Sequence, residues 1–205
     1  MSDYTHIIDG KSLTSPRKMD IINPANLRKI AEVPVATAEH LDKAVSAARK
    51  AFLSWSAKSQ EERAAVLLKM ALIIEQNMQE YKQLLTSEQG KPLADAEFEL
   101  NVCVGLMRRT AALRLPETVL FENDETRIIE RRVAIGVASI TVYSILVENF
   151  PIVLAILKLA PALLAGNTFV LKPSPTTPLT SLRLVKDMQT IIPPGVINVL
   201  SGDDG

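Results

Sequence analysis

The order of apolar and polar positions divides the chain into three stretches. Residues 4–35 hold short β-branched runs, broken at Asp9-Gly10 and Asn23-Pro24, and this pattern favours strands. Residues 36–115 carry apolar side chains at spacings of three and four, which predicts helices. Along residues 126–205, short apolar runs alternate with helical patterns. We therefore expect an α/β fold, in which an N-terminal β-hairpin and a helical block precede a partial Rossmann-like parallel sheet with the order β-α-β-α-β.

The helical stretch shows clear start and stop signals. Thr37 is a good N-cap residue, and Ser59 with Glu62 forms the capping-box pattern. Gly90 stands where a helix typically ends, and Pro92 follows it. We expect helices over residues 37–55, over 59–89 with a break near 77, and over 93–113.

The remaining elements follow from the same reasoning. Residues 117–125 are acidic and polar and predict a loop, whereas residues 126–133 alternate between apolar and charged and predict a half-exposed strand or arm. The parallel unit is expected to have strands at residues 137–142, 168–171 and 196–200, and helices at 151–165 and 178–190.

Composition excludes several classes of protein. Lys and Arg together number 23 and so do Asp and Glu, and a nucleic-acid-binding protein would normally show a basic surplus. One cysteine and two histidines argue against a disulfide scaffold and against a metal site. The longest apolar run, residues 152–165, is shorter than the ~18–20 residues that span a bilayer, and no signal peptide is evident. A cytoplasmic protein without membrane contact is expected.

Few residues suggest chemistry by themselves. Cys103 lies among apolar residues of a predicted helix and fits a small buried side chain better than a nucleophile. For His6 and His40, packing or surface roles fit better than catalysis. The segment Lys172-Pro173-Ser174-Pro175 follows an apolar strand at its carboxyl end, where α/β sheets bind ligands, so it is either a ribose or phosphate site or a surface loop. Asn149 precedes a predicted helix and is either a cap or an oxyanion donor.

Several short motifs, in their order and spacing, carry a family resemblance. They are Ile22-Asn23-Pro24-Ala25, Glu62-Arg63, Glu88-Gln89-Gly90-Lys91-Pro92, Asn149-Phe150-Pro151, Ala165-Gly166-Asn167-Thr168, Leu171-Lys172-Pro173-Ser174 and Pro194-Gly195-Val196-Ile197-Asn198. Together they make the chain resemble the N-terminal part of the aldehyde dehydrogenase family over essentially its whole length. Members of that family oxidise an aldehyde to a carboxylate with NAD⁺ or NADP⁺, by means of a cysteine thiolate and a glutamate that activates water.

The resemblance implies roles for particular residues. Asn149 would be the oxyanion carboxamide, and Lys158 would be a buried lysine near the active site, unless it is a lysine at the edge of the core. Ile140 and Thr141 would line the cofactor cleft at a strand end. The segment Lys172, Pro173, Ser174 and Pro175 would contact the adenosine ribose or its 2′-phosphate.

The chain also departs from the family pattern. The family has Pro-Trp directly before Asn-Phe-Pro, whereas here residues 142–148 stand between Thr141 and Asn149, an excess of five residues. Pro175 occupies the place of a glutamate that bonds the ribose hydroxyls in many members, which leaves NAD and NADP both open. The family's glycine-rich turn, its glutamate and its cysteine nucleophile would all follow Gly205.

Three hypotheses remain open from the sequence. The chain is a truncated family member that is inactive alone and binds NAD or NADP weakly or not at all. Alternatively, it is a non-catalytic remnant that binds an intact homologous subunit or a nucleotide, or it is a mis-assembled gene model. A small aldehyde is the substrate that the resemblance implies.

Overall fold

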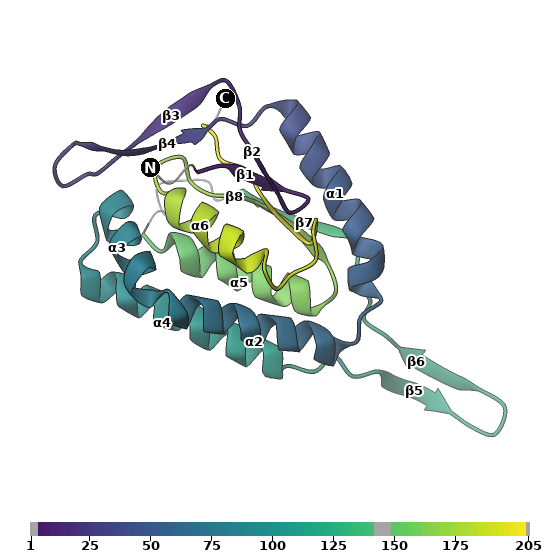
Figure 1. Ribbon diagram of the computed structural model, residues 1–205. Coiled ribbons are helices and arrows are strands. Elements are labelled where there is room, and N and C mark those ends of the chain that lie inside the picture. Colours follow the sequence, from purple (N-terminus) through teal and green to yellow (C-terminus); the bar gives the residue numbers. More distant parts are fainter. Residues whose placement is uncertain (1–3, 142–148, 204–205) are drawn as a thin grey trace.

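The computed structural model describes residues 4–141 and 149–203 (Figure 1). Its elements are β1 (His6–Ile8), β2 (Lys11–Leu13), β3 (Lys18–Ile22), β4 (Lys29–Pro34), α1 (Ala38–Ser56), α2 (Gln60–Gln76), α3 (Met78–Gln89), α4 (Leu93–Ala112), β5 (Thr118–Glu122), β6 (Arg127–Glu130), β7 (Val137–Thr141), α5 (Pro151–Leu164), β8 (Thr168–Lys172), α6 (Leu179–Met188) and β9 (Ile197–Val199). The predicted β-α-β-α-β order of the second half is confirmed. Within the described residues, no helix is both long and apolar enough to cross a membrane.

A five-stranded sheet forms the centre of the fold, with the order β2-β1-β9-β8-β7. Strands β7, β8 and β9 are parallel, as the alternation of strands and helices predicted. The N-terminal hairpin β1–β2 continues the sheet, because β1 pairs antiparallel with β9 through Ile7 and Val199. The sequence pattern did not indicate this pairing. It means that β1 covers the edge of the parallel unit.

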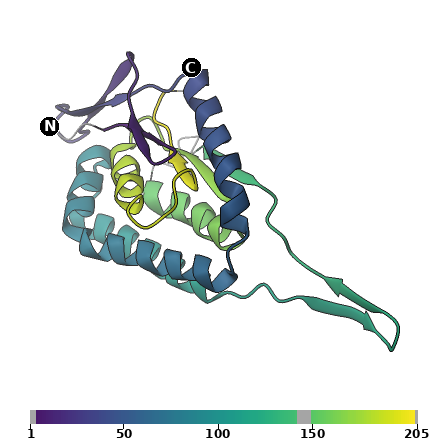
Figure 2. The same ribbon diagram turned by 45° about the vertical axis from the view of Figure 1, so that its right-hand side comes forward.

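Helices cover both faces of the sheet, with more helices on one face than on the other (Figures 1 and 2). α1 alone packs on one face, and α5 and α6 pack on the other. α2, α3 and α4 form a further layer outside α5 and α6. α1 adjoins α2 in the chain, yet it lies across the sheet from most of the helical block. α5 is consequently enclosed by a strand layer and a helix layer, which explains its apolar composition.

The predicted helix ends are present and their geometry explains them. The Thr37 hydroxyl accepts from the His40 N–H, and the Ser59 hydroxyl accepts from the Glu62 N–H at 3.2 Å. Gly90 ends α3 with a φ of +88°, a conformation that favours glycine. A Cβ at this position would lie 2.8 Å from Cγ of Pro24. The tight turn therefore brings the Asn23-Pro24 motif against the start of the segment that carries Lys91.

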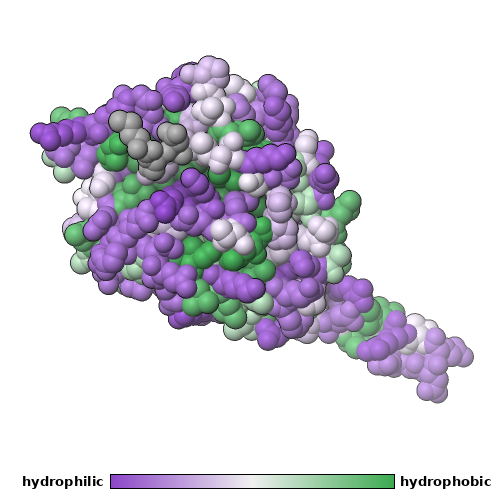
Figure 3. Space-filling model, in the orientation of Figure 1, coloured by the Kyte–Doolittle hydropathy of each residue, from purple (hydrophilic) through white to green (hydrophobic). Residues whose placement is uncertain are grey.

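A two-stranded arm, β5–β6, projects from the body of the molecule (Figure 2). The prediction of a loop over residues 117–125 was wrong, because this stretch contains β5. The apolar run at its centre has high strand propensity and pairs with β6, which confirms the predicted strand or arm over 126–133. The arm is exposed on both faces, and Figure 3 shows apolar side chains along it.

The carboxyl end of α5 is held by two side chains from outside the sheet. The Arg63 Nε donates to the Leu164 carbonyl at 2.8 Å, and the Trp55 indole N–H donates to the Leu163 carbonyl at 3.2 Å. Arg63 also donates to the carbonyls of Ser56 and Lys58, so its guanidinium joins the ends of α1 and α5. A cation at this place also complements the negative end of the α5 dipole.

We predict that Arg63→Met lowers the free energy of unfolding by about 1–3 kcal/mol, because it leaves buried carbonyls without donors. Arg63→Lys should recover little, since a lysine lacks the planar fork that reaches several carbonyls. Urea unfolding followed by circular dichroism measures both effects. The matched control is Arg108→Met, which removes an exposed ion pair with Glu75 and should cost no more than about 1 kcal/mol. Equal losses for the Arg63→Met and Arg108→Met variants would contradict this account.

Candidate functional site

The carboxyl edge of the parallel strands brings two predicted site segments together. Ile140 and Thr141 end β7, and Lys172 ends β8. In the register of the two strands Ile140 is paired with Leu171, and Thr141 is paired with Lys172. Lys172 is half-buried at this edge. The structure thus places a hydroxyl-bearing residue and a cationic residue side by side, where open α/β sheets bind their ligands.

Most of the loop after β8 packs inside the protein and bonds to itself, so less of it faces a ligand than the sequence indicated. Pro173 and Ser174 are buried, and the Ser174 hydroxyl lies 3.0 Å from the hydroxyl of Thr176. The Thr176 N–H also donates to the Ser174 oxygen, so this hydroxyl shapes the turn that leads into α6. Pro175 is half-buried and lines a groove of about 530 Å³ beside β3 and the end of α3. Lys172 is therefore the charged side chain that this segment presents at the sheet edge.

Asn149 lies two residues before α5 and is exposed. Its main-chain carbonyl accepts a hydrogen bond from Lys91 Nζ at 2.5 Å. The five-residue excess of the sequence falls on residues 142–148, which lie outside the described residues. The position of Asn149 in the structure therefore rests on its contacts with Lys91 and on the start of α5.

Lys158 does not have the environment that the resemblance implied. It is exposed on α5, next to Leu157, which is 44% exposed. The buried face of this helix carries Ala155, Ile156 and Leu159, so helical periodicity turns Lys158 away from the core. In the described chain this exposed position fits the alternative of a lysine at the edge of the core, and burial near an active site stays a prediction.

Sequence reasoning did not identify the burial of several charged residues, among them Glu88, Glu99 and Arg63, which are at most 8% exposed. Both oxygens of Glu88 accept from the first turn of α6, from Leu179 N–H at 2.6 Å and Thr180 N–H at 2.9 Å. In the first turn of α5 one oxygen of Glu99 accepts from the N–H groups of both Ile152 and Val153. The two glutamates belong to α3 and α4, so the helical block supplies the caps of both crossover helices.

A signal for these residues was present in the sequence. Each charged residue occupies a position on the apolar stripe of its own helix. The stripes are Tyr81, Leu85 and Glu88 in α3; Ala96, Glu99, Leu100, Cys103 and Met107 in α4; and Arg63, Leu67, Met70 and Ile74 in α2. A charged residue at a core position requires a buried partner, and that requirement would have identified all three.

Burial controls the protonation of this region. Burial raises the pKa of Glu88 to about 7, the hydrogen bonds from Thr180 and Leu179 oppose the rise, and the charge of Glu99 adds to it. Burial also raises the pKa of the Cys103 thiol well above its usual value, and Glu99 contributes to the same direction. A protonated thiol inside α4 is a poor nucleophile, in agreement with the packing role expected for Cys103.

His6 has a structural partner of its own. It is buried in β1, and its Nδ1 accepts from the Ser201 N–H at 3.2 Å. Burial, followed by the charge of His40, lowers the pKa of His6 to about 4. A neutral ring can accept this hydrogen bond, and the packing role expected for His6 fits that contact.

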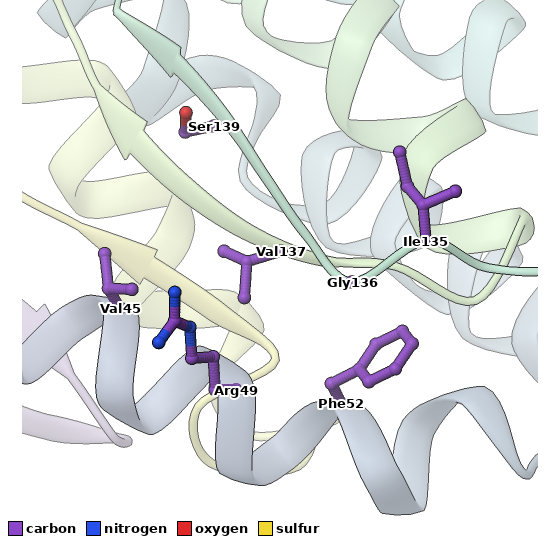
Figure 4. A pocket seen from close by; sticks show the side chains of 7 residues that line it. All are labelled: Val45, Arg49, Phe52, Ile135, Gly136, Val137 and Ser139. Carbon is purple, nitrogen blue, oxygen red and sulfur yellow. The ribbon is translucent and has the colours of Figure 1, made fainter.

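A separate pocket of about 400 Å³ lies between α1 and β7 (Figure 4). Val45, Arg49 and Phe52 line it from α1. The other side is supplied by Ile135, Gly136, Val137 and Ser139. It adjoins the amino end of β7, whereas Ile140 and Thr141 form the carboxyl end. The lining contains one cation and no carboxylate, thiol or imidazole. Across the described part of the chain, no three His, Cys, Asp or Glu residues are grouped so that they could hold a metal ion.

We predict a pH-dependent contribution of Glu88 to stability. Its pKa is about 7 in the native state against 4.5 ordinarily, so between these values the native state keeps a proton that the unfolded state has lost. The free energy of unfolding of the wild type, relative to Glu88→Gln, should therefore fall as the pH rises from 4.5 to 7. Chemical unfolding of both proteins at several pH values measures the difference, and the shared contribution of His6 cancels.

The control for this experiment is Glu97→Gln, which removes a half-exposed carboxylate of α4 that pairs with Lys82. The wild type should not lose stability relative to this variant over the same pH range. A Glu88→Gln difference that is constant would show that Glu88 is ionised throughout.

Comparisons with known proteins agree with this architecture. The model of the aldehyde dehydrogenase family matches residues 11–205. A putative aldehyde dehydrogenase of Gibberella fujikuroi is 34% identical over 201 residues, and the human 2-aminomuconic semialdehyde dehydrogenase is 35% identical over 202 residues; these matches cover 98% and 96% of this chain. They cover only 42% and 41% of the relatives, so the chain spans less than half of their length.

Solved structures give the same result. An NADP-dependent enzyme of E. coli superposes with a TM-score of 0.93 at 31% identity, over 99% of this chain and 43% of that one. PnpE of Pseudomonas sp. WBC-3 superposes with a TM-score of 0.90 at 32% identity, over 98% of this chain and 42% of that one. The order of strands, the motifs at the sheet edge and the family match lead to one conclusion: this chain belongs to the aldehyde dehydrogenase family.

Proposed function

We propose that this chain takes part in the NAD⁺- or NADP⁺-dependent oxidation of an aldehyde to a carboxylate. Its own contribution is the adenosine end of the cofactor site and the carboxamide that stabilises an oxyanion. One observation carries the proposal: Lys172 stands beside Thr141 at the carboxyl edge of the sheet, in a chain that belongs to this family. The cofactor, when bound, supplies the acceptor for the hydride of the aldehyde.

The residues at the sheet edge carry the chemical groups that can bind a dinucleotide. The Lys172 ammonium can donate to ribose hydroxyls or to a phosphate, and Thr141 adds a hydroxyl-bearing residue at the end of β7. Ser174 supports the site by holding the turn through Thr176, so its contribution is to the course of the loop. PnpE has been solved with nicotinamide adenine dinucleotide, which supports the same class of cofactor for this chain.

Position 175 bears on the choice between the two cofactors. A carboxylate there would accept from ribose hydroxyls and would repel a 2′-phosphate, and Pro175 does neither. The E. coli structure is of an NADP-dependent enzyme, whereas PnpE has been solved with NAD. The chain is therefore compatible with both cofactors, and binding measurements decide between them.

Asn149 is the residue that we assign to the oxyanion. A carboxamide N–H can donate to the oxygen that gains charge when a nucleophile adds to the aldehyde carbonyl. The exposed position of Asn149 leaves its side chain accessible to a small molecule. Cys103 has no part in that addition, because it is buried inside α4 and its raised pKa keeps it protonated.

The chain should bind NAD⁺ or NADP⁺ with a Kd of about 1 mM or weaker, near −4 kcal/mol, because only the adenosine end has assigned contacts. Lys172→Ala should weaken that binding roughly tenfold, which corresponds to about 1.4 kcal/mol. Titration of the ¹⁵N-labelled chain, followed by NMR, measures the Kd and shows whether the amides of Thr141 and Lys172 shift.

The matched control is Lys186→Ala, which removes an exposed lysine at the far end of α6. It should leave the Kd unchanged. Binding that is insensitive to Lys172→Ala, or shifts confined to another face of the sheet, would refute the assignment of this site.

A further inference from the structure

A continuous chain of buried contacts leads from the helical block to Asn149. Lys91 follows the turn at Gly90, and its Nζ donates both to Glu99 and to the main-chain carbonyl of Asn149. The Oε1 atom of Glu99 accepts from the N–H groups of Ile152 at 2.7 Å and Val153 at 3.2 Å. The pair thus holds Asn149, two residues before α5, and the first turn of α5 at the same time.

The burial of this ion pair makes its energy depend strongly on the geometry of its partners. The side chain of Glu99 is fully buried, and that of Lys91 is 8% exposed. A buried charge is tolerated only when its partners are in place, so neither residue can relax without a cost to the other. The positive end of the α5 dipole adds a further interaction for Glu99. The geometry of residues 149–153 is therefore tightly coupled to this pair.

Two more contacts fix where Lys91 stands. Its Nζ lies 4.6 Å from the centre of the Phe150 ring, a cation–π contact next to Asn149. Its own N–H donates to the side chain of Gln89 at 3.0 Å. Lys91 is thus placed by the end of α3 and the start of α4, two rigid elements, and its ammonium is directed at one backbone segment.

We propose that Lys91 and Glu99 are positioning residues for Asn149, which rests on the oxyanion role proposed for Asn149 above. The Lys91 ammonium fixes the main chain of Asn149, and Glu99 fixes the helix that continues from it. Only the side-chain torsions of Asn149 then remain to be set before its carboxamide can donate. A donor that is held before the reaction costs little reorganisation when the oxyanion forms. The Gly90-Lys91-Pro92 motif would then serve to place Lys91 against the main chain of Asn149.

The decisive variant is Lys91→Met, studied in the ¹⁵N-labelled chain without cofactor or aldehyde. Glu99 keeps its two backbone donors in this variant, so the first turn of α5 should remain ordered. Asn149 loses its donor, so its backbone order parameter should fall from about 0.85, typical of rigid backbone, to below about 0.6. The order parameters of Ile152 and Val153 should change little.

The matched control is Lys82→Met. Lys82 joins α3 to α4 through an ion pair with Glu97 at 2.6 Å, and this pair involves no residue of the 149–153 segment. A merely structural role for Lys91 would make the two variants alike: both would lose thermal stability and neither would release Asn149. The proposal requires that only Lys91→Met releases Asn149, and that Lys91→Arg restores its order.

Two results would overturn the proposal: an Asn149 that is already mobile in the wild type, or an Asn149 that stays rigid in Lys91→Met. If Lys91→Met does not fold, Glu99→Gln takes its place. It should speed hydrogen exchange at Ile152 and Val153 at least tenfold and lower the order of Asn149, and an unchanged Asn149 would refute the coupling. These measurements need no nucleotide, so a failure of the proposed cofactor site would not be confused with a failure of positioning.

Discussion

The first turns of α5 and α6 are buried, and their backbone N–H groups find partners in side chains of other helices. A buried N–H group without an acceptor is costly, and every helix begins with several such groups. Glu99 meets this requirement for α5 and Glu88 meets it for α6. Both come from the helical block, which therefore cannot separate from the sheet without exposing two carboxyl groups and two helix ends. At the other end of α5, Arg63 supplies the complementary charge.

This constraint places the candidate site. α5 and α6 begin at the edge where β7 and β8 end, so the two glutamates hold the helix starts that lie at this edge. Glu88 holds the start of α6, directly after the loop of Lys172. Glu99, with Lys91, holds the start of α5, directly after Asn149. The chemistry proposed for the sheet edge thus depends on residues that belong to a different layer of the fold.

Local signals in the sequence predicted most of the elements, and long-range contacts account for what was missed. Thr37, Ser59 and Gly90 act within one helical turn, so their patterns predicted the ends of α1, α2 and α3. The pairing of Ile7 with Val199 joins opposite ends of the chain, and no local pattern encodes it. The strand β5 was missed because acidic neighbours concealed a short apolar run.

The candidate site shows the same division. The strands predicted over residues 137–142 and 168–171 end within one residue of Thr141 and Lys172, because alternation of strands and helices marks where each strand stops. The buried environment of Lys158 was inferred from resemblance, whereas the helical periodicity of α5 favours the alternative, a lysine at the edge of the core. The roles of Glu88, Glu99 and Arg63 depend on partners about 53 to 101 positions away, although their places on apolar stripes marked them as unusual.

Native-state hydrogen exchange tests most directly whether the buried carboxylates join the helical block to the sheet. N–H groups in the first turn of a helix usually exchange readily, because they lack intrahelical partners. The account predicts that the amides of Ile152 and Thr180 exchange with the same free energy as the amide of Phe169, which donates to Val196 in the centre of the sheet. Exchange of Ile152 and Thr180 through local opening, with a much lower free energy than Phe169, would contradict it.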